Sequence, residues 1–158
     1  MKVIASILFV ILLVVLDQAS KIYLTLVNKT SPIDLEVIRG FFKITYTCND
    51  GAAFSILKGK RVFFIIMTIV VVFLIVYYLL KNKVYWVEKY SLLLIISGAV
   101  GNLIDRIMYG YVIDFLDFII FGYDFPVFNI ADSFITIGAI GLIISILFLN
   151  KEGENAGN

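Results

Sequence analysis

The 158-residue chain contains no histidine and a single cysteine, Cys48. The absence of histidine excludes Ser–His and Cys–His nucleophilic pairs, the H-E-x-x-H zinc motif and histidine proton relays. One cysteine cannot form an intramolecular disulfide, and with no partner thiol we expect Cys48 to be dispensable. Any hydrolytic chemistry must therefore use Asp, Glu, Ser, Lys or Cys side chains.

Charged residues are also scarce. They make up 16% of the chain, whereas 61% of the residues are hydrophobic. A soluble domain has about a quarter of its residues charged. The net charge of +1 gives no sign of nucleic-acid binding. The apolar residues gather in long runs, so the composition indicates an integral membrane protein in which each acidic residue needs a reason.

Four apolar segments predict transmembrane helices at about 3–24, 62–80, 85–105 and 132–149. The first follows Lys2 and taken alone could be a secretory signal peptide, but the later spans favour a membrane-embedded chain. The polar interval at about 30–57 is rich in β-branched and aromatic residues and predicts a small β-sheet on the membrane surface. We expect a single membrane domain over residues 1–158.

The lysines and arginines do not orient these spans. Four spans place both termini on one side of the membrane, and the positive-inside rule makes the side richer in Lys and Arg cytoplasmic. Here the opposite side carries more of these residues. The raw count would therefore place the termini outside.

The stretch 112–133 carries four of the twelve acidic residues. A carboxylate close to hydrocarbon is costly, which makes it a candidate functional group. Asp114 and Asp132 lie eighteen positions apart, and the interval between them is long enough to leave a helix and return. If both face one cavity, one keeps a proton while the other stays ionised, so the pair could activate water without histidine. Alternatively, Asp132 caps the last helix.

Other polar residues fall at helical spacings. Asp17 and Lys21 are four apart and can pair on one helix face, either as an ion pair that ends the span or as part of a site. Asn102, Asp105 and Arg106 form one polar face at the end of the third segment. That face is either a helix terminus with an Asp–Arg pair or the wall of a site, with Asp105 holding Arg106.

Asn49 is followed by the small residues of a Gly51-Ala-Ala stretch. Glycine lets a backbone or a ligand approach closely, although an ordinary turn would also explain it. The carboxylates do not cluster at ligand spacing, so we expect no metal and no cofactor.

Five motifs stand in order along the chain: D-Q-x-[ST]-K, N-x-G-A-A-F, G-N-x-x-D-R, V-x-D-F and F-N-x-A-D-S. Together, over residues 1–150, they resemble the signal peptidase II family of lipoprotein signal peptidases. The resemblance implies an aspartic endopeptidase that cleaves diacylglyceryl-modified prolipoproteins just before the lipidated cysteine. It also implies a mainly α membrane protein of the bacterial cytoplasmic membrane. Four transmembrane helices would carry an extracytoplasmic β-sheet cradle between the first two, with both termini cytoplasmic.

The same resemblance implies roles for individual residues. Asp114 and Asp132 would be the catalytic dyad. The residues that bind substrate or support the dyad would be Asp17, Lys21, Asn49, Gly51, Asn102, Asp105, Arg106 and Asn129. Many members carry a basic or other polar residue where this chain has Cys48. The implied partners are lipid-modified prolipoproteins and membrane lipid, for a protein that we expect to be a monomer.

Two other classes of function fit part of the pattern. A small proton-coupled transporter would use carboxylates and an arginine at membrane depth. It would place polar residues at mid-depth in several spans, whereas segment 62–80 has no charged residue and the carboxylates collect at one edge. A structural subunit would leave the Asn–Asp motifs unexplained. The sequence therefore favours the peptidase.

Overall fold

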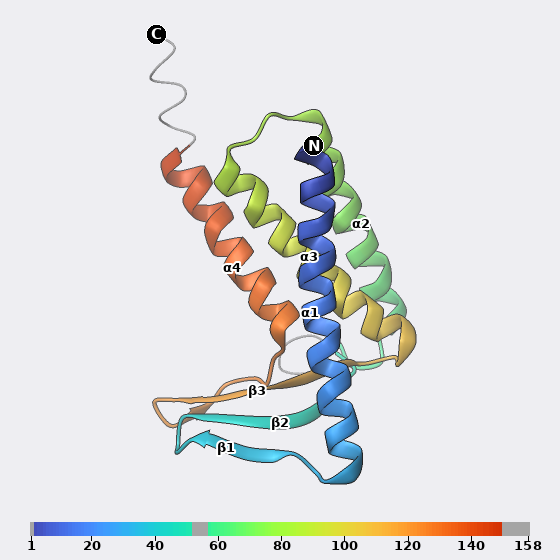
Figure 1. The fold of residues 1–158 in the computed structure, drawn as a ribbon, viewed down its shortest axis with the longest axis vertical. Helices are drawn as coiled ribbons and strands as arrows, with labels where there is room; N and C mark the ends of the chain where they lie inside the picture. The colour runs from blue at the N-terminus through green and yellow to red at the C-terminus, as the bar shows by residue number, and fades with distance from the viewer. Residues whose placement is uncertain (1, 52–56, 150–158) are drawn as a thin grey trace.

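The computed structural model describes residues 2–51 and 57–149. Four long helices run side by side (Figure 1): α1, Lys2–Thr30; α2, Arg61–Lys81; α3, Trp86–Met108; and α4, Ile130–Ile144, which continues as the π-helical turn η2, Ser145–Leu149. Within the described residues, these four helices are long and apolar enough to cross a membrane. No residue of α2 is buried, because its apolar side chains face outward, as lipid-facing side chains do. The four apolar segments predicted from the sequence are therefore confirmed as helices.

The helices pack around α3, which contacts α1, α2 and α4. Small residues bring α3 and α4 close together. A Cβ atom added to Gly98 would overlap the backbone oxygen of Ala131, and one added to Gly138 would lie 2.6 Å from the backbone oxygen of Ser91. Small residues at such crossings allow backbones in a membrane to approach closely. This packing fixes the start of α4 against α3.

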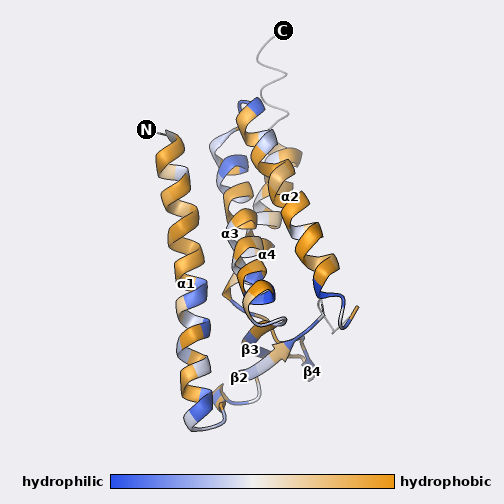
Figure 2. Cartoon of the chain, turned by 90° about the vertical axis from the view of Figure 1, so that its right-hand side faces the viewer, coloured by the Kyte–Doolittle hydropathy of each residue, from blue (hydrophilic) through white to orange (hydrophobic). Residues whose placement is uncertain are grey.

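A four-stranded antiparallel sheet lies across the end of the helix bundle where α1 ends and α4 begins (Figure 1). Its strands, in spatial order, are β1, Asp34–Ile38; β2, Phe42–Asn49; β3, Val112–Ile120; and β4, Tyr123–Asp124. The expected mainly α fold with a small sheet is thus confirmed. Figure 2 shows the mostly hydrophobic bodies of the helices, with hydrophilic residues near their ends and on the sheet.

The sheet is larger than the predicted interval of 30–57. Strands β3 and β4 come from the connection between α3 and α4, and β3 pairs with β2 so that Thr47 lies opposite Asp114. The first four residues of β3 are buried, which explains why this apolar stretch becomes a strand despite its two aspartates. Residues 52–54, expected in the cradle, lie outside the described residues.

Helix α1 continues past the predicted end of the first span. Its 29 residues correspond to about 43 Å, whereas the hydrocarbon core is about 30 Å thick. The extra turns reach the sheet, where the hydroxyls of Thr25 and Tyr46 lie 3.2 Å apart. The polar residues after position 24 therefore belong to the helix, and α1 connects the bundle to the sheet.

Candidate active site

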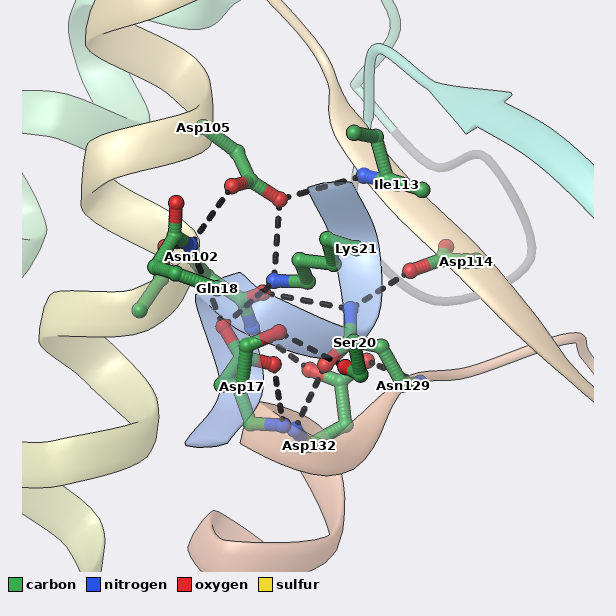
Figure 3. A network of polar contacts seen from close by, with 12 residues as sticks. Asp17, Gln18, Ser20, Lys21, Asn102, Asp105, Ile113, Asp114, Asn129 and Asp132 are labelled. Atoms are coloured by element: carbon green, nitrogen blue, oxygen red, sulfur yellow. Dashed lines mark hydrogen bonds and ion pairs between the residues drawn. The ribbon is translucent and has the colours of Figure 1, made fainter. Parts of the chain in front are cut away.

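The structure brings Asp114 and Asp132 to the junction between the sheet and the helices (Figure 3). Asp114 lies on β3, and Asp132 lies in the first turn of α4. Both line one cavity of about 650 Å³. Asp114 and Asp132, which the sequence had indicated, therefore line the same cavity, although they are eighteen positions apart in the chain.

Asn129 is the N-cap of α4 and contacts both aspartates. Its Oδ1 accepts a hydrogen bond from the backbone N–H of Asp132 (2.9 Å), and the Asp132 carboxylate accepts one from the backbone N–H of Asn129 (3.3 Å). This reciprocal pair is a capping box. The Nδ2 group of Asn129 donates to Asp114 Oδ1 at 2.7 Å. The capping and site interpretations of Asp132 are therefore compatible, because the cap itself aligns the carboxylate.

Asp114 is 2% exposed and accepts hydrogen bonds on both oxygens. Oδ1 binds Asn129, and Oδ2 binds Nδ2 of Asn49 at 2.9 Å. Burial, the largest cause, and the nearby Asp132 carboxylate together raise the pKa of Asp114 from 3.8 to about 7. The two amide hydrogen bonds lower it, but only in part. Near neutral pH, Asp114 can therefore hold or release a proton, as a general acid–base group must.

Asn102 connects the second aspartate to a buried cation. Its Nδ2 donates to Asp132 Oδ1 at 2.7 Å, while its Oδ1 accepts from Lys21 Nζ at 3.1 Å and from Asn129 Nδ2 at 3.2 Å. Every polar atom of this amide is used, so its orientation is fixed. A continuous path of hydrogen bonds runs from Lys21 to Asp132.

Lys21 lies in a buried cluster beneath the two aspartates. Its Nζ forms ion pairs of 2.9 Å with both Asp17 and Asp105, and none of the three side chains is more than 1% exposed. The Asp17 carboxylate also accepts from the backbone N–H of Ala131 in α4 (3.0 Å). A buried charge persists only when it is paired and hydrogen-bonded. Asp17 and Lys21 therefore do more than end a span: they tie α1 to α3 and to the start of α4.

Asp105 does not hold Arg106, so the expected Asp–Arg pair is corrected, although Asn102 and Arg106 of the same face do line the cavity. Its two oxygens accept from Lys21, from Gln18 Nε2 (2.9 Å) and from the backbone N–H of Ile113 (3.2 Å). Adjacent residues on a helix point in different directions and do not face each other. Asp105 therefore points to α1 and β3, away from the cavity that Arg106 lines.

Arg106 and Asn49 meet at Gly51. Arg106 Nη2 donates to the carbonyl oxygen of Gly51 at 3.1 Å, and the guanidinium lies 4.9 Å from the centre of the Phe64 ring. The backbone N–H of Gly51 donates to Asn49 Oδ1 at 3.0 Å, which leaves the Asn49 amide N–H directed at Asp114. Gly51 is buried, and its hydrogen bonds orient both Asn49 and Arg106. An ordinary exposed turn would not do this.

Gln18 is a residue that the sequence interpretation missed. Its Nε2 donates to Asp105 Oδ1, to the carbonyl oxygen of Gly101 (3.1 Å) and to Asp17 Oδ2 (3.2 Å). Its position beside Asp17 in the D-Q-x-[ST]-K motif is the sequence feature that could have identified it as a site residue. Gln18 joins α1 to α3 next to the Lys21 cluster.

A second cavity, of about 480 Å³, meets the first at Asp114. The two share Asn49, Asp114, Pro126 and Val127 as lining residues. Away from the two aspartates, the first cavity is lined mainly by apolar side chains of the helices, among them Phe64, Ile135 and Ile137. The second cavity is lined by residues of the sheet and of the loop after it, including Cys48 and Asp124. Asp114 therefore faces both an apolar and a more polar space.

The described residues contain no group of three or more acidic or cysteine side chains arranged to hold a metal ion. The expected absence of a metal stays a prediction. The aspartates have other partners: Asn49 and Asn129 donate to Asp114, and Asn102 donates to Asp132. The arrangement suits proton transfer between carboxylates and a bound water.

Comparison with known proteins places this chain in a family. The family model described as signal peptidase (SPase) II matches residues 9–148. The lipoprotein signal peptidases of Staphylococcus aureus strains JH9 and Newman are each 46% identical over 143 residues, which cover 90% of this chain and 87% of theirs. A bacterial membrane enzyme solved by the in meso method at 2.3 Å superposes with a TM-score of 0.82 and 44% identity, covering 90% of this chain and 87% of the other. A second such structure, at 1.9 Å, has a TM-score of 0.79 and 44% identity, covering 91% and 93%. With a family model over most of its length and relatives this similar, the chain belongs to the signal peptidase II family.

Proposed function

We propose that this protease works by aspartic chemistry, with Asp114 and Asp132 as its catalytic pair. Membership of the family makes the chain a bacterial membrane protease that removes signal peptides from prolipoproteins. The transporter alternative gains no support from the comparisons. The observation that carries the aspartic proposal is that two carboxylates from β3 and α4 line one cavity and are joined through Asn129.

In this mechanism the two carboxyl groups hold different protonation states. Asp114, with a pKa of about 7, carries the proton, and Asp132 is the ionised partner because it accepts N–H donors from Asn102 of α3 and from the backbone at the N-terminus of α4. Asp132 takes a proton from a water whose oxygen attacks the scissile carbonyl carbon, and Asp114 donates its proton to the carbonyl oxygen. Asp132 then passes its proton to the leaving nitrogen, the C–N bond breaks, and a hydroxyl of the tetrahedral intermediate returns a proton to Asp114. No other reactant is required.

Arg106 is the residue we assign to the substrate backbone. Within the described residues it makes one hydrogen bond, to Gly51, and it lines the cavity beside the aspartates, so further N–H groups remain for a substrate carbonyl. The amides of Asn49, Asn102 and Asn129 already bind the carboxylates. Their role is therefore to orient the dyad. This division assigns substrate binding to Arg106 and support of the dyad to the three asparagines.

The substrate's lipid fits the apolar part of the cavity. Phe64 comes from α2 and Ile135 and Ile137 from α4, so this wall continues the lipid-facing surface of the bundle. Burying acyl chains contributes about 0.8 kcal/mol per CH₂ when they leave water, but a chain already in the bilayer gains little more. The diacylglyceryl group would therefore act by holding the lipidated cysteine at the depth of the dyad.

We further propose that the site opens at the extracytoplasmic face and that both termini are cytoplasmic. The sheet and the cavity lie at the end of the bundle opposite the first residues of α1 (Figure 1). A secreted prolipoprotein presents its cysteine on the extracytoplasmic side, so a monomer with its site there would meet the substrate without a partner subunit. Inaccessibility of Lys151 and accessibility of Cys48 to impermeant labels in intact cells would support this orientation, and the reverse would overturn it.

The test of function uses purified protein and two forms of one prolipoprotein, lipidated and unlipidated. We expect the lipidated form to be shortened, seen as a gel shift, and the unlipidated form to be cut very slowly. An unrelated membrane anchor attached beside the cysteine should restore cleavage in part. Rapid cleavage of the unlipidated, unanchored substrate would contradict the positioning role of the lipid.

A further inference from the structure

A groove of about 440 Å³ lies at the end of the bundle away from the sheet, outside the candidate active site. Ile7 and Val10 of α1 and Val76 and Leu80 of α2 form its walls, and Leu93 and Ile96 of α3 form its floor. The first residues of α1 and the connection between α2 and α3 meet at this end (Figure 1). Helices α1 and α2 both pack on α3, and the groove runs between them.

The groove has the length of one lipid leaflet. Its lining on α1 extends from Val3 to Ile11, which is roughly 12 Å along the helix axis. The hydrocarbon core is about 30 Å thick, so one leaflet contributes about 15 Å. The volume lies within the range of about 300–1,000 Å³ that is usual for ligand pockets. The groove can therefore take an acyl chain of a single leaflet along its length.

A lysine stands at the polar end of this groove. Lys89 lines it and is half-buried, and Lys81 and Lys83 are exposed nearby in the chain. Glu88, the neighbouring acid, is buried and accepts a 2.6 Å hydrogen bond from the hydroxyl of Tyr78. In the part of the chain that the structure describes, no carboxylate forms an ion pair with Lys89. Among the described residues, an apolar groove thus ends in a cation that has no ion-pair partner.

Aromatic residues place this end at the level of the lipid headgroups. Tyr77, Tyr85 and Tyr90 are exposed, and Trp86, the chain's single tryptophan, is 73% exposed. Tyrosine and tryptophan gather at the membrane–water interface, where their rings are apolar and their tips polar. Lys89, three residues after Trp86, can extend its charge to the same level. The apolar part of the groove then lies beside the acyl chains.

We propose that this groove is a binding site for an anionic phospholipid, with one acyl chain between α1 and α2 and the phosphate at Lys89. Basic pockets between transmembrane helices bind anionic headgroups in this way. A zwitterionic lipid also carries a phosphate, but its ammonium group would lie close to Lys89 and be repelled. The site therefore favours a headgroup with net negative charge. This assignment is independent of the peptidase chemistry.

The size of the groove decides against a protein helix as its occupant. A helix with side chains is at least about 10 Å across, so a 12 Å length fills roughly 900 Å³. That is about twice the groove's volume of about 440 Å³. A signal-peptide helix or a helix from a second copy would fit only after α1 and α2 moved apart. An acyl chain is narrower and fits the groove as it stands.

Native mass spectrometry of the full chain in mild detergent tests the proposal. Phosphatidylglycerol and phosphatidylcholine with identical acyl chains are titrated separately, and we expect one phosphatidylglycerol to be retained with several-fold higher affinity. Lys89→Gln should weaken its binding about fivefold, the factor for about 1 kcal/mol, which is the contribution of one lysine near an anionic membrane surface. Lys81→Gln is the matched control, because it removes the same charge at the same end from a residue that does not line the groove.

Ile7→Trp fills the groove without changing its charge and should reduce binding of both lipids. All three variants should retain prolipoprotein cleavage, which shows that they fold. Equal affinity for the two lipids, or equal losses in Lys89→Gln and Lys81→Gln, would overturn the anionic site. A protein dimer that Ile7→Trp dissociates would overturn it as well, because the groove would then be an interface between copies.

Discussion

The side-chain amide of Asn129 donates a 2.7 Å hydrogen bond to Oδ1 of Asp114. The same residue caps α4, and the capping box includes the carboxylate of Asp132. One buried side chain therefore joins β3 to the first turn of α4. The alignment of the proposed dyad depends on this residue more directly than on any contact between the two aspartates themselves.

Two substitutions of Asn129 distinguish its role as the N-cap of α4 from its hydrogen bond to Asp114, which we call the bridge. Asn129→Ser keeps a good N-cap oxygen but removes the amide that binds Asp114, whereas Asn129→Ala removes both. We expect both variants to lose at least tenfold in turnover. Asn129→Ala should also lose about 1 kcal/mol more of unfolding free energy than Asn129→Ser, the usual value of an N-cap. Thermal unfolding in detergent and a gel-shift assay measure the two effects. Near wild-type turnover in Asn129→Ser would remove the bridge from the mechanism.

Replacement of either aspartate should abolish cleavage. Asp114→Asn cannot donate an acidic proton, and Asp132→Asn cannot accept one from water, so neither remaining partner can perform both steps. We expect cleavage to fall at least a thousandfold in each variant, with expression and membrane insertion unchanged. Asp124→Asn, an exposed aspartate on β4, is the control and should stay active. Substantial turnover in Asp114→Asn or Asp132→Asn would exclude that residue from the dyad.

The pKa of Asp114 predicts how stability depends on pH. Because folding raises this pKa from 3.8 to about 7, the folded state binds the proton more tightly than the unfolded state. The stabilisation is complete below pH 3.8 and is lost as the pH rises to about 7. At about 1.36 kcal/mol per pH unit, the difference is about 4 kcal/mol.

Asp114→Asn does not titrate, so its stability relative to wild type should rise between pH 4 and pH 8. The amide also brings an N–H group against Asn49 or Asn129, and this cost, about 1–3 kcal/mol, is the same at every pH. Melting temperatures of both proteins across this range give the comparison. A constant difference from pH 4 to pH 8 would mean that folding does not raise the pKa of Asp114.

Local patterns in the sequence account for the helices and for the choice of aspartates. Long apolar runs reveal membrane spans because every span must be apolar over its length. Asp114 and Asp132 attract attention because carboxylates are rare beside such runs. The pairing of β3 with β2 was not predictable in this way, since Asn49 and Asp114 are 65 positions apart and nothing local indicates the partner. Strand register depends on non-local contacts of this kind.

Other structural features depend on where a side chain points or on the backbone conformation, and composition reveals neither. Asp105 and Arg106 are adjacent, so a pair between them was a natural expectation, yet Asp105 binds Lys21 across the helix interface. The turn before β4 places Phe121 at a φ of 53°, a conformation that a bulky residue rarely adopts. Gly122, with a φ of 78°, signals the turn, but nothing in the sequence indicates that Phe121 shares its conformation.

We predict that Cys48 is dispensable for cleavage, but that a bulky group attached to its thiol blocks access to the site. It is exposed and lines the cavity that shares Asn49 and Asp114 with the apolar one. We expect Cys48→Ser to cleave within about twofold of wild type. A bulky maleimide should slow the wild type strongly, a small methylthio label should slow it little, and neither should affect Cys48→Ser. Loss of activity in Cys48→Ser would reopen a nucleophilic role for the thiol.

Two glycines test whether the buried cluster beneath the dyad contributes to catalysis or only to packing. A Cβ atom on Gly101 would lie 2.5 Å from the Asp17 carboxylate, whereas one on Gly138 would lie 2.6 Å from the backbone oxygen of Ser91, away from the cavity residues. Each alanine substitution therefore overpacks a helix contact and should cost about 1–3 kcal/mol of stability. Both variants add one methyl group to a helix contact, but Gly101→Ala displaces the Asp17 carboxylate and Gly138→Ala displaces the backbone of Ser91.

Gly101→Ala pushes on Asp17, which pairs with Lys21 and binds the backbone of Ala131, the residue before Asp132. We expect its kcat to fall at least tenfold with little change in KM, because a misaligned dyad loses transition-state stabilisation while substrate binding persists. Gly138→Ala, assayed equally far below its own melting temperature, should keep a near wild-type kcat. Equal losses of kcat in both variants would indicate that the cluster supports only the fold, because activity would then follow stability alone.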